Sequence, residues 1–387
     1  MTRSAQPSAL IYVQHLLGIG HLARISRVAA ALRDHGVRTS VVRGGMPVDG
    51  FDVPGVDSIQ LDPIRADPQS LDRLVDADGA VFDEARKLRR ADALLGLVRQ
   101  LKPDILLIEA FPFGRRAMRF ELVPLVQQAR GFGVKVVAAS IRDILQLNRK
   151  AGRAEETVAL INQLFDLVLV HGDEDATPLG ASFSLAAQIA SRTVYTGIVG
   201  SSTVSAPNRE HDVIVSVGGG AVGDALISAA VAAAPHSAMA DASWLVLTGP
   251  NMSDANRRRL AADGAANITF RPFVDDLAAR LAGARLSISQ AGYNTVADIL
   301  STGCRSVLVP FESGGETEQI TRANMVAQSG RAVVVREQDL ETNSMIAAID
   351  RAILLPPPPA VPVQDGAGNT AVILMDRVAK PAPSSWP

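Results

Sequence analysis

Short runs of consecutive apolar residues, separated by longer segments of helical period, constrain the fold of this chain more than any other feature. The runs are apolar throughout instead of alternating with polar residues, which is typical of parallel strands covered on both faces. They occupy residues 9–15, 39–43, 105–109, 135–140 and 167–170, and again residues 212–217, 243–248, 286–289, 306–310 and 331–335. Helical segments lie between them, among them residues 23–35, 119–130, 225–234 and 323–329. This alternation predicts an α/β protein with doubly wound parallel sheets.

The length of the chain and a linker-like segment predict two domains, because 387 residues are more than one ordinary hydrophobic core contains. Residues 201–210 are mostly small or polar, include a proline and separate two strand–helix patterns, which indicates a linker. We expect an N-terminal domain in residues 1–200 and a C-terminal domain in residues 211–370. Residues 371–387 should form a last helix and a tail.

Composition and charge disfavour several classes of partner and location. Apolar residues make up 47% and charged residues 20%, which is globular composition, and the formal charge of -2 offers no global field for nucleic acid. A single cysteine, Cys304, excludes an intramolecular disulfide and a thiolate metal cluster. We see no secretory leader and no apolar segment of membrane-spanning length, and therefore expect a cytoplasmic protein.

The first apolar run leads into a glycine-containing loop and a histidine. Gly18 and Gly20 allow a tight turn and a close approach of a ligand to the following helix N-terminus. Ala23 stands where the dinucleotide fingerprint has its third glycine, which disfavours a nicotinamide cofactor. His21 lies at the mouth of this loop, where an imidazole can take a proton from an attacking hydroxyl. A histidine that only caps the helix or fills the loop is an equal alternative.

Two carboxylates in the same half are second-choice bases or acceptor contacts. Glu109 ends an apolar run, and Asp143 follows the next one. For Glu109 an ion pair with Arg115 or Arg116 is the somewhat favoured ordinary role, and for Asp143 a helix cap is an equal alternative.

Two acidic triplets, Asp-Ala-Asp at residues 76–78 and Asp-Glu-Asp at residues 173–175, fit the letters of a metal-binding D-x-D motif. Acid runs of this size are common in solvated loops and helix starts. We therefore expect no essential metal.

The C-terminal half carries further loops of the same kind. Gly219 and Gly220 follow the run 212–217, where the backbone can wrap an anion, although a plain turn is the ordinary alternative. A strand should end at Gln290, followed by Gly292 and by a helix that opens at Asn294 or Thr295. The first N–H groups of that helix and the Thr295 hydroxyl form an anion site suited to a diphosphate.

Further polar residues follow this anion site. Asp298, about one turn into the helix, is placed to accept hydrogen bonds from ribose hydroxyls, and Glu318 and Gln319 offer acceptors for sugar hydroxyls. Each also has an ordinary role, since an acid favours any helix N-terminus and Asn294 and Thr295 are common caps. The combination of these residues favours a nucleotide-sugar site over the ordinary role of each one alone.

Residues 290–330 resemble the nucleotide-sugar-binding region of GT-B glycosyltransferases. They are most similar to family 28, which contains the peptidoglycan lipid II-forming N-acetylglucosaminyltransferase, and less similar to plant and macrolide glycosyltransferases. The shared residues, in order and near register, are Gly292, Thr295, Asp298, Gly303, Pro310, Glu318 and Gln319. The loops at residues 18–21 and 216–220 resemble glycine-rich loops of that family, and residues 108–116 resemble a bacterial subgroup of predicted glycosyltransferases.

The resemblance implies a fold and a set of roles. The fold would be two Rossmann-like doubly wound domains facing across a cleft, with the acceptor on the N-terminal side. The glycines around Gly292 and Thr295 would hold the diphosphate, Asp298 the ribose, backbone near Phe273 and Val274 the base, and Glu318 and Gln319 the sugar. His21 matches the family's N-terminal loop histidine, proposed as general base or acceptor contact.

Two departures from the family concern the donor. Relatives usually carry Glu at the position of Asp298, which puts nucleotide choice in doubt. They often place His or Arg where this chain has the neutral Gln290, so diphosphate charge would rest on helix N-termini and an arginine from elsewhere.

We therefore expect a metal-independent, inverting glycosyltransferase without a cofactor. It would move a hexose-type sugar from a nucleotide diphosphate donor, with UDP favoured by the resemblance, to an acceptor hydroxyl. The acceptor class stays open between a glycan, a lipid-linked compound that would bring peripheral membrane contact, and a small molecule. The alternatives are a nucleotide-sugar hydrolase or epimerase on the same fold and a non-catalytic nucleotide-sugar-binding protein.

Overall fold

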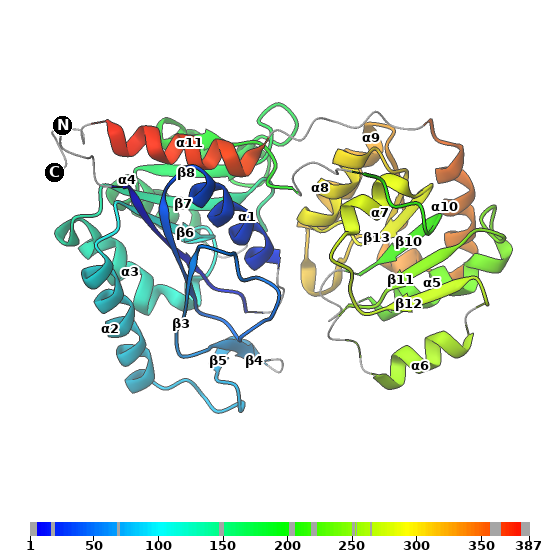
Figure 1. Cartoon of the computed structure of the whole chain (residues 1–387), viewed down its shortest axis with the longest axis horizontal. Helices are drawn as coiled ribbons and strands as arrows, with labels where there is room; N and C mark the ends of the chain where they lie inside the picture. Colours follow the sequence, from blue (N-terminus) through cyan, green and yellow to red (C-terminus); the bar gives the residue numbers. More distant parts are fainter. Residues whose placement is uncertain are drawn as a thin grey trace. The chain divides into compact units, whose positions relative to one another are not determined.

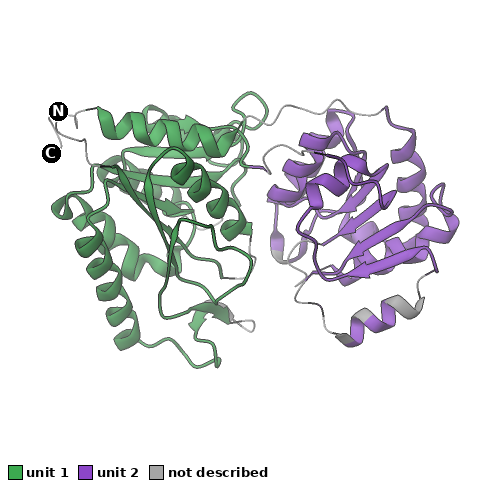
Figure 2. Ribbon diagram, viewed as in Figure 1, with its two compact units in different colours: residues 1–199, 364–387 green, residues 200–363 purple. Residues whose placement is uncertain are grey.

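The computed structural model describes residues 6–16, 20–67, 70–146, 151–200, 206–217, 223–249, 252, 254–263, 265–356 and 365–380. The chain divides into two compact units, coloured separately in Figure 2. Unit 1 comprises Met1–Val199 and Gln364–Pro387, and unit 2 comprises Gly200–Val363. The first boundary adjoins the segment whose composition predicts a linker. The chain then returns, so the last helix is part of unit 1 instead of a separate C-terminal segment.

Unit 1 is built on a parallel sheet with the strand order β3-β2-β1-β6-β7-β8-β9. Its strands are β1 (Ser8–Val13), β2 (Arg38–Arg43), β3 (Asp57–Gln60), β6 (Ile105–Glu109), β7 (Val136–Arg142), β8 (Leu167–His171) and β9 (Thr193–Tyr195). An antiparallel pair, β4 (Arg65–Asp67) and β5 (Ser70–Val75), lies outside this sheet. The central strands β1 and β6 are buried along their whole length, as strands covered on both faces must be.

Helices cover both faces of this sheet (Figure 1). They are α1 (Gly20–Asp34), α2 (Glu84–Leu101), α3 (Arg119–Gln128), α4 (Arg153–Leu164) and α11 (Gly366–Ala379). On one face Ile25 of α1 and Leu374 of α11 share a core with Ile11 of β1. On the other face α2, α3 and α4 pack around Leu10 and Tyr12.

Unit 2 contains a second parallel sheet, in the order β12-β11-β10-β13-β14-β15. Its strands are β10 (Val213–Ser216), β11 (Trp244–Leu247), β12 (Ile268–Arg271), β13 (Leu286–Ser289), β14 (Ser306–Leu308) and β15 (Ala332–Val334). The helices are α5 (Asp224–Ala233), α6 (Asp254–Asp263), α7 (Leu277–Gly283), α8 (Tyr293–Thr302), α9 (Glu318–Gln328) and α10 (Thr342–Leu354). One core joins the sheet to α5 and α10, and another joins it to α7, α8 and α9.

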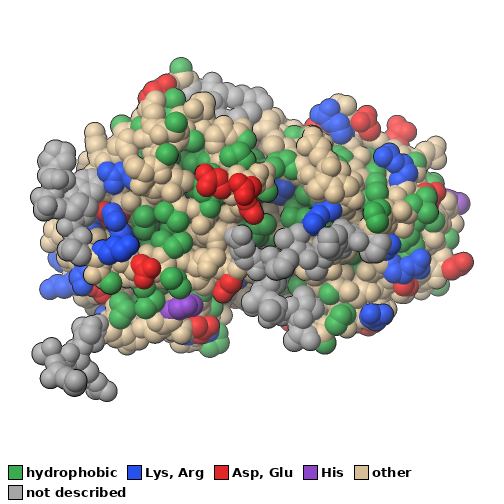
Figure 3. All heavy atoms as spheres, turned by 90° about the horizontal axis from the view of Figure 1, so that it is seen from above, with side chains coloured by type: hydrophobic (Ala, Val, Ile, Leu, Met, Phe, Trp, Pro, Cys, Tyr) green, Lys and Arg blue, Asp and Glu red, His purple; other side chains and the backbone are tan. Residues whose placement is uncertain are grey.

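Short 3₁₀ helices connect several of these elements. They are η1 (Arg116–Met118), η2 (Ala129–Phe132), η3 (Leu179–Ala181), η4 (Ala186–Arg192), η5 (Ala234–His236), η6 (Ser313–Gly315) and η7 (Glu337–Asp339). None of the described helices combines the length and the apolar character that a membrane span requires. On the face drawn in Figure 3, acidic and basic side chains are scattered among apolar ones.

Both sheets have the strand order of doubly wound, Rossmann-like folds, which confirms the predicted fold class. Counted along the chain, the strands of unit 2 run 3-2-1-4-5-6, and unit 1 has the same order with one more strand. The order reverses between β1 and β6 in unit 1 and between β10 and β13 in unit 2. Ligands of such sheets bind outside the carboxyl ends of the strands at this reversal, the topological switch point.

The apolar runs locate the interior strands but miss three at the edges. β3, β9 and β12 lie at sheet edges, and their residues are exposed or only partly buried. An edge strand with an exposed face carries no continuous apolar run, which is why periodicity does not reveal it.

Candidate active site

At the switch point of the unit 1 sheet, the predicted histidine His21 contacts the predicted carboxylate Glu109. His21 is the second residue of α1, which follows β1, and Glu109 is the last residue of β6, the neighbour of β1. His21 Nδ1 lies 2.9 Å from Glu109 Oε1. Glu109 is fully buried, whereas 15% of the His21 side-chain surface is exposed. Solvent therefore contacts part of the His21 side chain but not the carboxylate of Glu109.

Arg24, three residues further along α1, is the ion-pair partner of Glu109 through its Nη2. Burial raises the pKa of Glu109, but the charge of Arg24 and the hydrogen bonds from His21 and Ser140 outweigh it and hold that pKa well below its usual range. Glu109 is therefore ionised at neutral pH.

The ion pair that the sequence favours for Glu109, with Arg115 or Arg116, is not the one that forms. Arg115 donates from Nε to the backbone oxygen of Gln14 at 2.5 Å, and Arg116 pairs with Glu156. The partner comes from α1 because β1 and β6 are neighbours, which brings the start of α1 over the end of β6.

The ionised carboxylate decides which nitrogen of His21 carries the proton. Nδ1 faces Glu109 and acts as the donor, so Nε2 keeps its lone pair. Arg24 Nη2 lies 3.2 Å from Nδ1, but an arginine only donates, so this contact adds no hydrogen bond in that tautomer. Burial and then the charge of Arg115 lower the pKa of His21 to about 3. At neutral pH the ring is thus uncharged, with Nε2 as a proton acceptor.

Glu109 is the first member of a series of buried, hydrogen-bonded side chains that extends across β7 and β8. Ser140 Oγ donates to Glu109 Oε2 and lies 2.9 Å from His171 Nε2, and His171 Nδ1 lies 2.8 Å from Thr196 Oγ1. Since the Ser140 proton goes to Glu109, His171 Nε2 must donate to Ser140, and His171 Nδ1 accepts from Thr196. Burial lowers the pKa of His171 to about 3, so this ring is also neutral.

Asp143, the other predicted carboxylate, follows the strand that carries Ser140. It is buried and accepts a hydrogen bond from its neighbour Ile144 N at 2.8 Å. Its charge acts on His171. The next helix, α4, begins ten residues later at Arg153, so Asp143 does not cap it.

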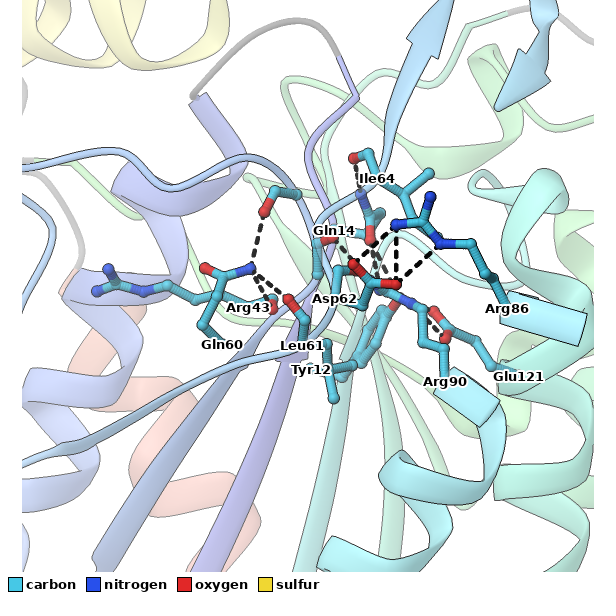
Figure 4. A network of polar contacts seen from close by, with 12 residues as sticks. Tyr12, Gln14, Arg43, Gln60, Leu61, Asp62, Ile64, Arg86, Arg90 and Glu121 are labelled. Atoms are coloured by element: carbon cyan, nitrogen blue, oxygen red, sulfur yellow. Dashed lines mark hydrogen bonds and ion pairs between the residues drawn. The ribbon is translucent and has the colours of Figure 1, made fainter. Parts of the chain in front are cut away.

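A second buried network holds the segment that precedes α1. Arg90 of α2 and Glu121 of α3 form an ion pair with both side chains fully buried, with 2.7 Å between Nε and Oε2. Tyr12 donates to the same carboxylate, and Arg90 Nη2 lies 2.9 Å from Gln14 Oε1 (Figure 4). The Gln14 amide in turn donates to two backbone carbonyls. The exit of β1 is therefore held in place by α2 and α3.

Several predicted glycines fall outside the described residues. Gly18 lies in segment 17–19, and Gly219 and Gly220 lie in segment 218–222. Gly20 is described and is the first residue of α1.

The switch point of unit 2 carries the predicted helix N-terminus. α8 begins at Tyr293 with Gly292 as its N-cap, slightly earlier than the predicted start at Asn294 or Thr295. Val296 N bonds to Gly292 O at 3.0 Å, so the regular hydrogen bonds of the helix begin after the N–H groups of its first turn. These groups lie directly after β13 and can bind an anion.

The predicted sugar-binding pair at the start of α9 also supports this loop. Gln319 Oε1 accepts from the backbone N–H groups of Ala291 and Phe311, at 3.1 Å each. Glu318 is buried and accepts from Arg322 Nη1 at 2.9 Å, while the same Nη1 lies 3.2 Å from Ala291 O. Both side chains thus fix the loop between β13 and α8, a role that the sequence pattern does not reveal.

The other predicted donor contacts occupy different environments. Asp298 is buried in α8, one turn beyond the anion site. Phe273, after β12, is 63% exposed, and Val274 is partly buried. Gln290 follows β13, and its backbone N–H lies 3.4 Å from Ser216 O of the neighbouring β10. An exposed aromatic ring at Phe273 is available for stacking.

The acidic triplets form turns. Asp76 accepts from the N–H groups of Asp78 and Ala80 and pairs with Arg86, and Asp173 accepts from Asp175 N. Their carboxylates serve local structure, as expected of loop acids.

Residues 213–362 match the Glycosyltransferase family 28 C-terminal domain. This span holds the whole unit 2 sheet and helices α5 to α10. Unit 2 therefore carries the C-terminal domain of glycosyltransferase family 28. The fold of the chain agrees, since the structure of Acinetobacter baumannii MurG has a TM-score of 0.56 at 16% identity over 96% of this chain and 100% of that one. CalG4, the calicheamicin glycosyltransferase, has a TM-score of 0.59 at 14% identity over 96% and 95%.

A curated relative of this chain is the UDP-N-acetylglucosamine--N-acetylmuramyl-(pentapeptide) pyrophosphoryl-undecaprenol N-acetylglucosamine transferase of Paraburkholderia xenovorans. It is 26% identical over 273 residues, which are 67% of this chain and 64% of the relative. The chain matches between 20% and 64% of the length of the curated relatives compared with it. The matched family domain includes the N-terminus of α8 but not the His21–Glu109 pair of unit 1.

Proposed function

We propose that the chain transfers a hexose-type sugar from a nucleotide diphosphate to a hydroxyl group of an acceptor. The observation that carries this proposal is the His21–Glu109 pair at the unit 1 switch point. A neutral, partly exposed imidazole with Nδ1 on a buried carboxylate is the arrangement of a general base that accepts a proton at Nε2. The curated relative named above takes UDP-N-acetylglucosamine by name, which favours uridine as the nucleotide.

In the proposed reaction the acceptor oxygen attacks the anomeric carbon while its proton passes to His21 Nε2. The bond between that carbon and the diphosphate oxygen breaks, and its electron pair leaves with the nucleotide. A single displacement of this kind inverts the anomeric configuration. Glu109 stabilises the imidazolium that forms, and Arg24 keeps Glu109 ionised.

We assign the donor to unit 2. The N–H groups at the start of α8 would hold the diphosphate, Asp298 the ribose, the Phe273 and Val274 segment the base, and Glu318 and Gln319 the sugar. The helix N-terminus also stabilises the charge of the leaving nucleotide, so the proposal includes no metal ion.

The test measures nucleotide release from UDP-hexoses mixed with a panel of hydroxylated acceptors, with and without EDTA. His21→Ala should lower kcat by roughly 10²- to 10⁴-fold because the attacking hydroxyl loses its base, while donor affinity stays near the wild-type value. Transfer at the wild-type rate by His21→Ala would exclude this base. Release of nucleotide and free sugar at the same rate without any acceptor would instead indicate a hydrolase.

A further inference from the structure

Among the described residues, no carboxylate forms an ion pair with the guanidinium group of Arg115. It lies in the loop between β6 and η1 and has a left-handed backbone with φ of 56°, which is unfavourable for a side chain other than glycine. Its Nε donates to Gln14 O, which places the guanidinium at the carboxyl end of β1. The neighbouring Arg116, in contrast, has its partner in Glu156.

The charges around Arg115 are unbalanced. Burial is the largest of the influences that lower the pKa of Arg115 to about 10; the charges of Arg142 and Arg24 act in the same direction, and the charge of Glu109 opposes them. Glu109 is already engaged by Arg24, His21 and Ser140. Arg115 is therefore still protonated at neutral pH, in a partly buried place where other guanidinium groups repel it. Such a charge is stabilised when a ligand of opposite charge binds to it.

We propose that Arg115 binds an oxyanion of the acceptor, a carboxylate or a phosphate, close to the hydroxyl that His21 deprotonates. This inference rests on the proposed function and adds the substrate class, an acidic acceptor instead of a neutral alcohol. The planar guanidinium matches both kinds of oxyanion with two parallel hydrogen bonds. The N-terminus of α1 at Gly20 adds partial positive charge at the same strand ends.

The same contact links acceptor binding to the base. The charge of Arg115 is, after burial, the largest influence that lowers the pKa of His21. An oxyanion bound at Arg115 offsets that charge, so His21 Nε2 becomes a better proton acceptor when an acidic acceptor is in place. The base then stays weak until its substrate arrives.

The experiment uses the full chain saturated with UDP, so that the donor site is filled, and titrates inorganic phosphate by calorimetry. Arg115→Met should weaken phosphate binding by about 10- to 100-fold, the loss expected for charge-assisted hydrogen bonds. Arg115→Lys should keep part of the affinity, because it keeps the charge without the planar fork. Arg116→Met is the matched control and should bind phosphate as the wild type does. In parallel, NMR titration of His21 should show a pKa that rises with phosphate in the wild type but not in Arg115→Met.

Equal phosphate affinity in the wild type and Arg115→Met would overturn the proposal, and so would a wild type that binds no phosphate. If Arg115→Met does not fold, Arg115→Lys and the His21 titration provide the same comparison. Failure of the proposed function appears separately, as a chain that does not bind UDP. In that case phosphate is titrated without UDP, and the comparison of variants still decides the role of Arg115.

Discussion

At the residue scale, two histidines at the carboxyl edge of the unit 1 sheet are held uncharged. Burial is the first cause that lowers the pKa of both His21 and His171 to about 3. In an unfolded chain both would titrate near about 6.5. Between these values the unfolded state binds more protons than the folded state. Their contribution to stability is therefore fully present above about pH 6.5 and is lost as the pH falls toward 3.

His171→Gln should remove one of these titrations. Between pH 7 and pH 5 the wild type should lose about 2 kcal/mol more free energy of unfolding than the variant. The reason is that the unfolded wild type takes up a proton at His171 in this range, whereas the unfolded variant has no imidazole at this position. Urea unfolding at both pH values measures the difference, with His35→Gln, at an exposed residue directly after α1, as the control. An identical pH dependence in the wild type and His171→Gln would contradict a neutral His171.

The sequence reveals part of this site and not the rest. His21 and Glu109 can be predicted because each stands just beyond an apolar strand, where a doubly wound sheet binds its ligands. Their contact depends on β1 pairing with β6, and the links to Ser140 and His171 depend on the order of β6, β7 and β8. Nothing in residue spacing states that order. Arg24 could have been predicted to lie beside His21, since residues three apart share one face of a helix.

At the element scale, α2 and α3 are joined to β1 by the buried pair Arg90 and Glu121 (Figure 4). Glu121→Gln should lower the free energy of unfolding by roughly 3–5 kcal/mol, because Arg90 would keep a buried charge without its partner. The double variant Arg90→Met with Glu121→Leu should recover most of that loss. Urea unfolding of the three proteins measures it. A double variant as unstable as Glu121→Gln would show that the ion pair itself stabilises the fold.

The C-terminal helix α11 approaches unit 1 backbone closely at Gly366. A Cβ at this position would lie 2.4 Å from the backbone oxygen of Gly197, and Asn369 of the same helix donates to Thr196 O at 2.9 Å. Gly366→Ala should therefore cost roughly 1–3 kcal/mol, since the helix must shift away from the segment it packs on. Gly96→Ala in α2, where a Cβ meets open space, is the control and should be neutral or slightly stabilising. Equal thermal stability of both variants would contradict the tight contact.

At the scale of the whole molecule, the sequence predicts two doubly wound sheets because interior strands are apolar throughout. It does not predict that the chain returns to unit 1, since a C-terminal apolar helix looks the same whichever core it joins. The family match covers unit 2, and the His21–Glu109 pair lies in unit 1. For that reason the donor class can be proposed from similarity, while the acceptor class must be inferred from side chains such as Arg115.

Nucleotide should bind within unit 2. Hydrogen exchange with and without UDP should show protection of residues 290–298 at the start of α8, because the diphosphate would accept hydrogen bonds from those N–H groups. Protection confined to the strand ends of unit 1 would place the nucleotide on the wrong sheet.

The most direct measurement of the central claim is thermal stabilisation of the full chain by UDP, dTDP, GDP, ADP and their sugar conjugates, with and without EDTA. We expect stabilisation by one diphosphate, UDP, of about 2.7 kcal/mol at 100 times its dissociation constant. The effect should be lost in Asp298→Ala, retained in the exposed control Asp376→Ala, and insensitive to EDTA. Stabilisation by none of these nucleotides, or by UDP equally in wild type and Asp298→Ala, would contradict the donor site.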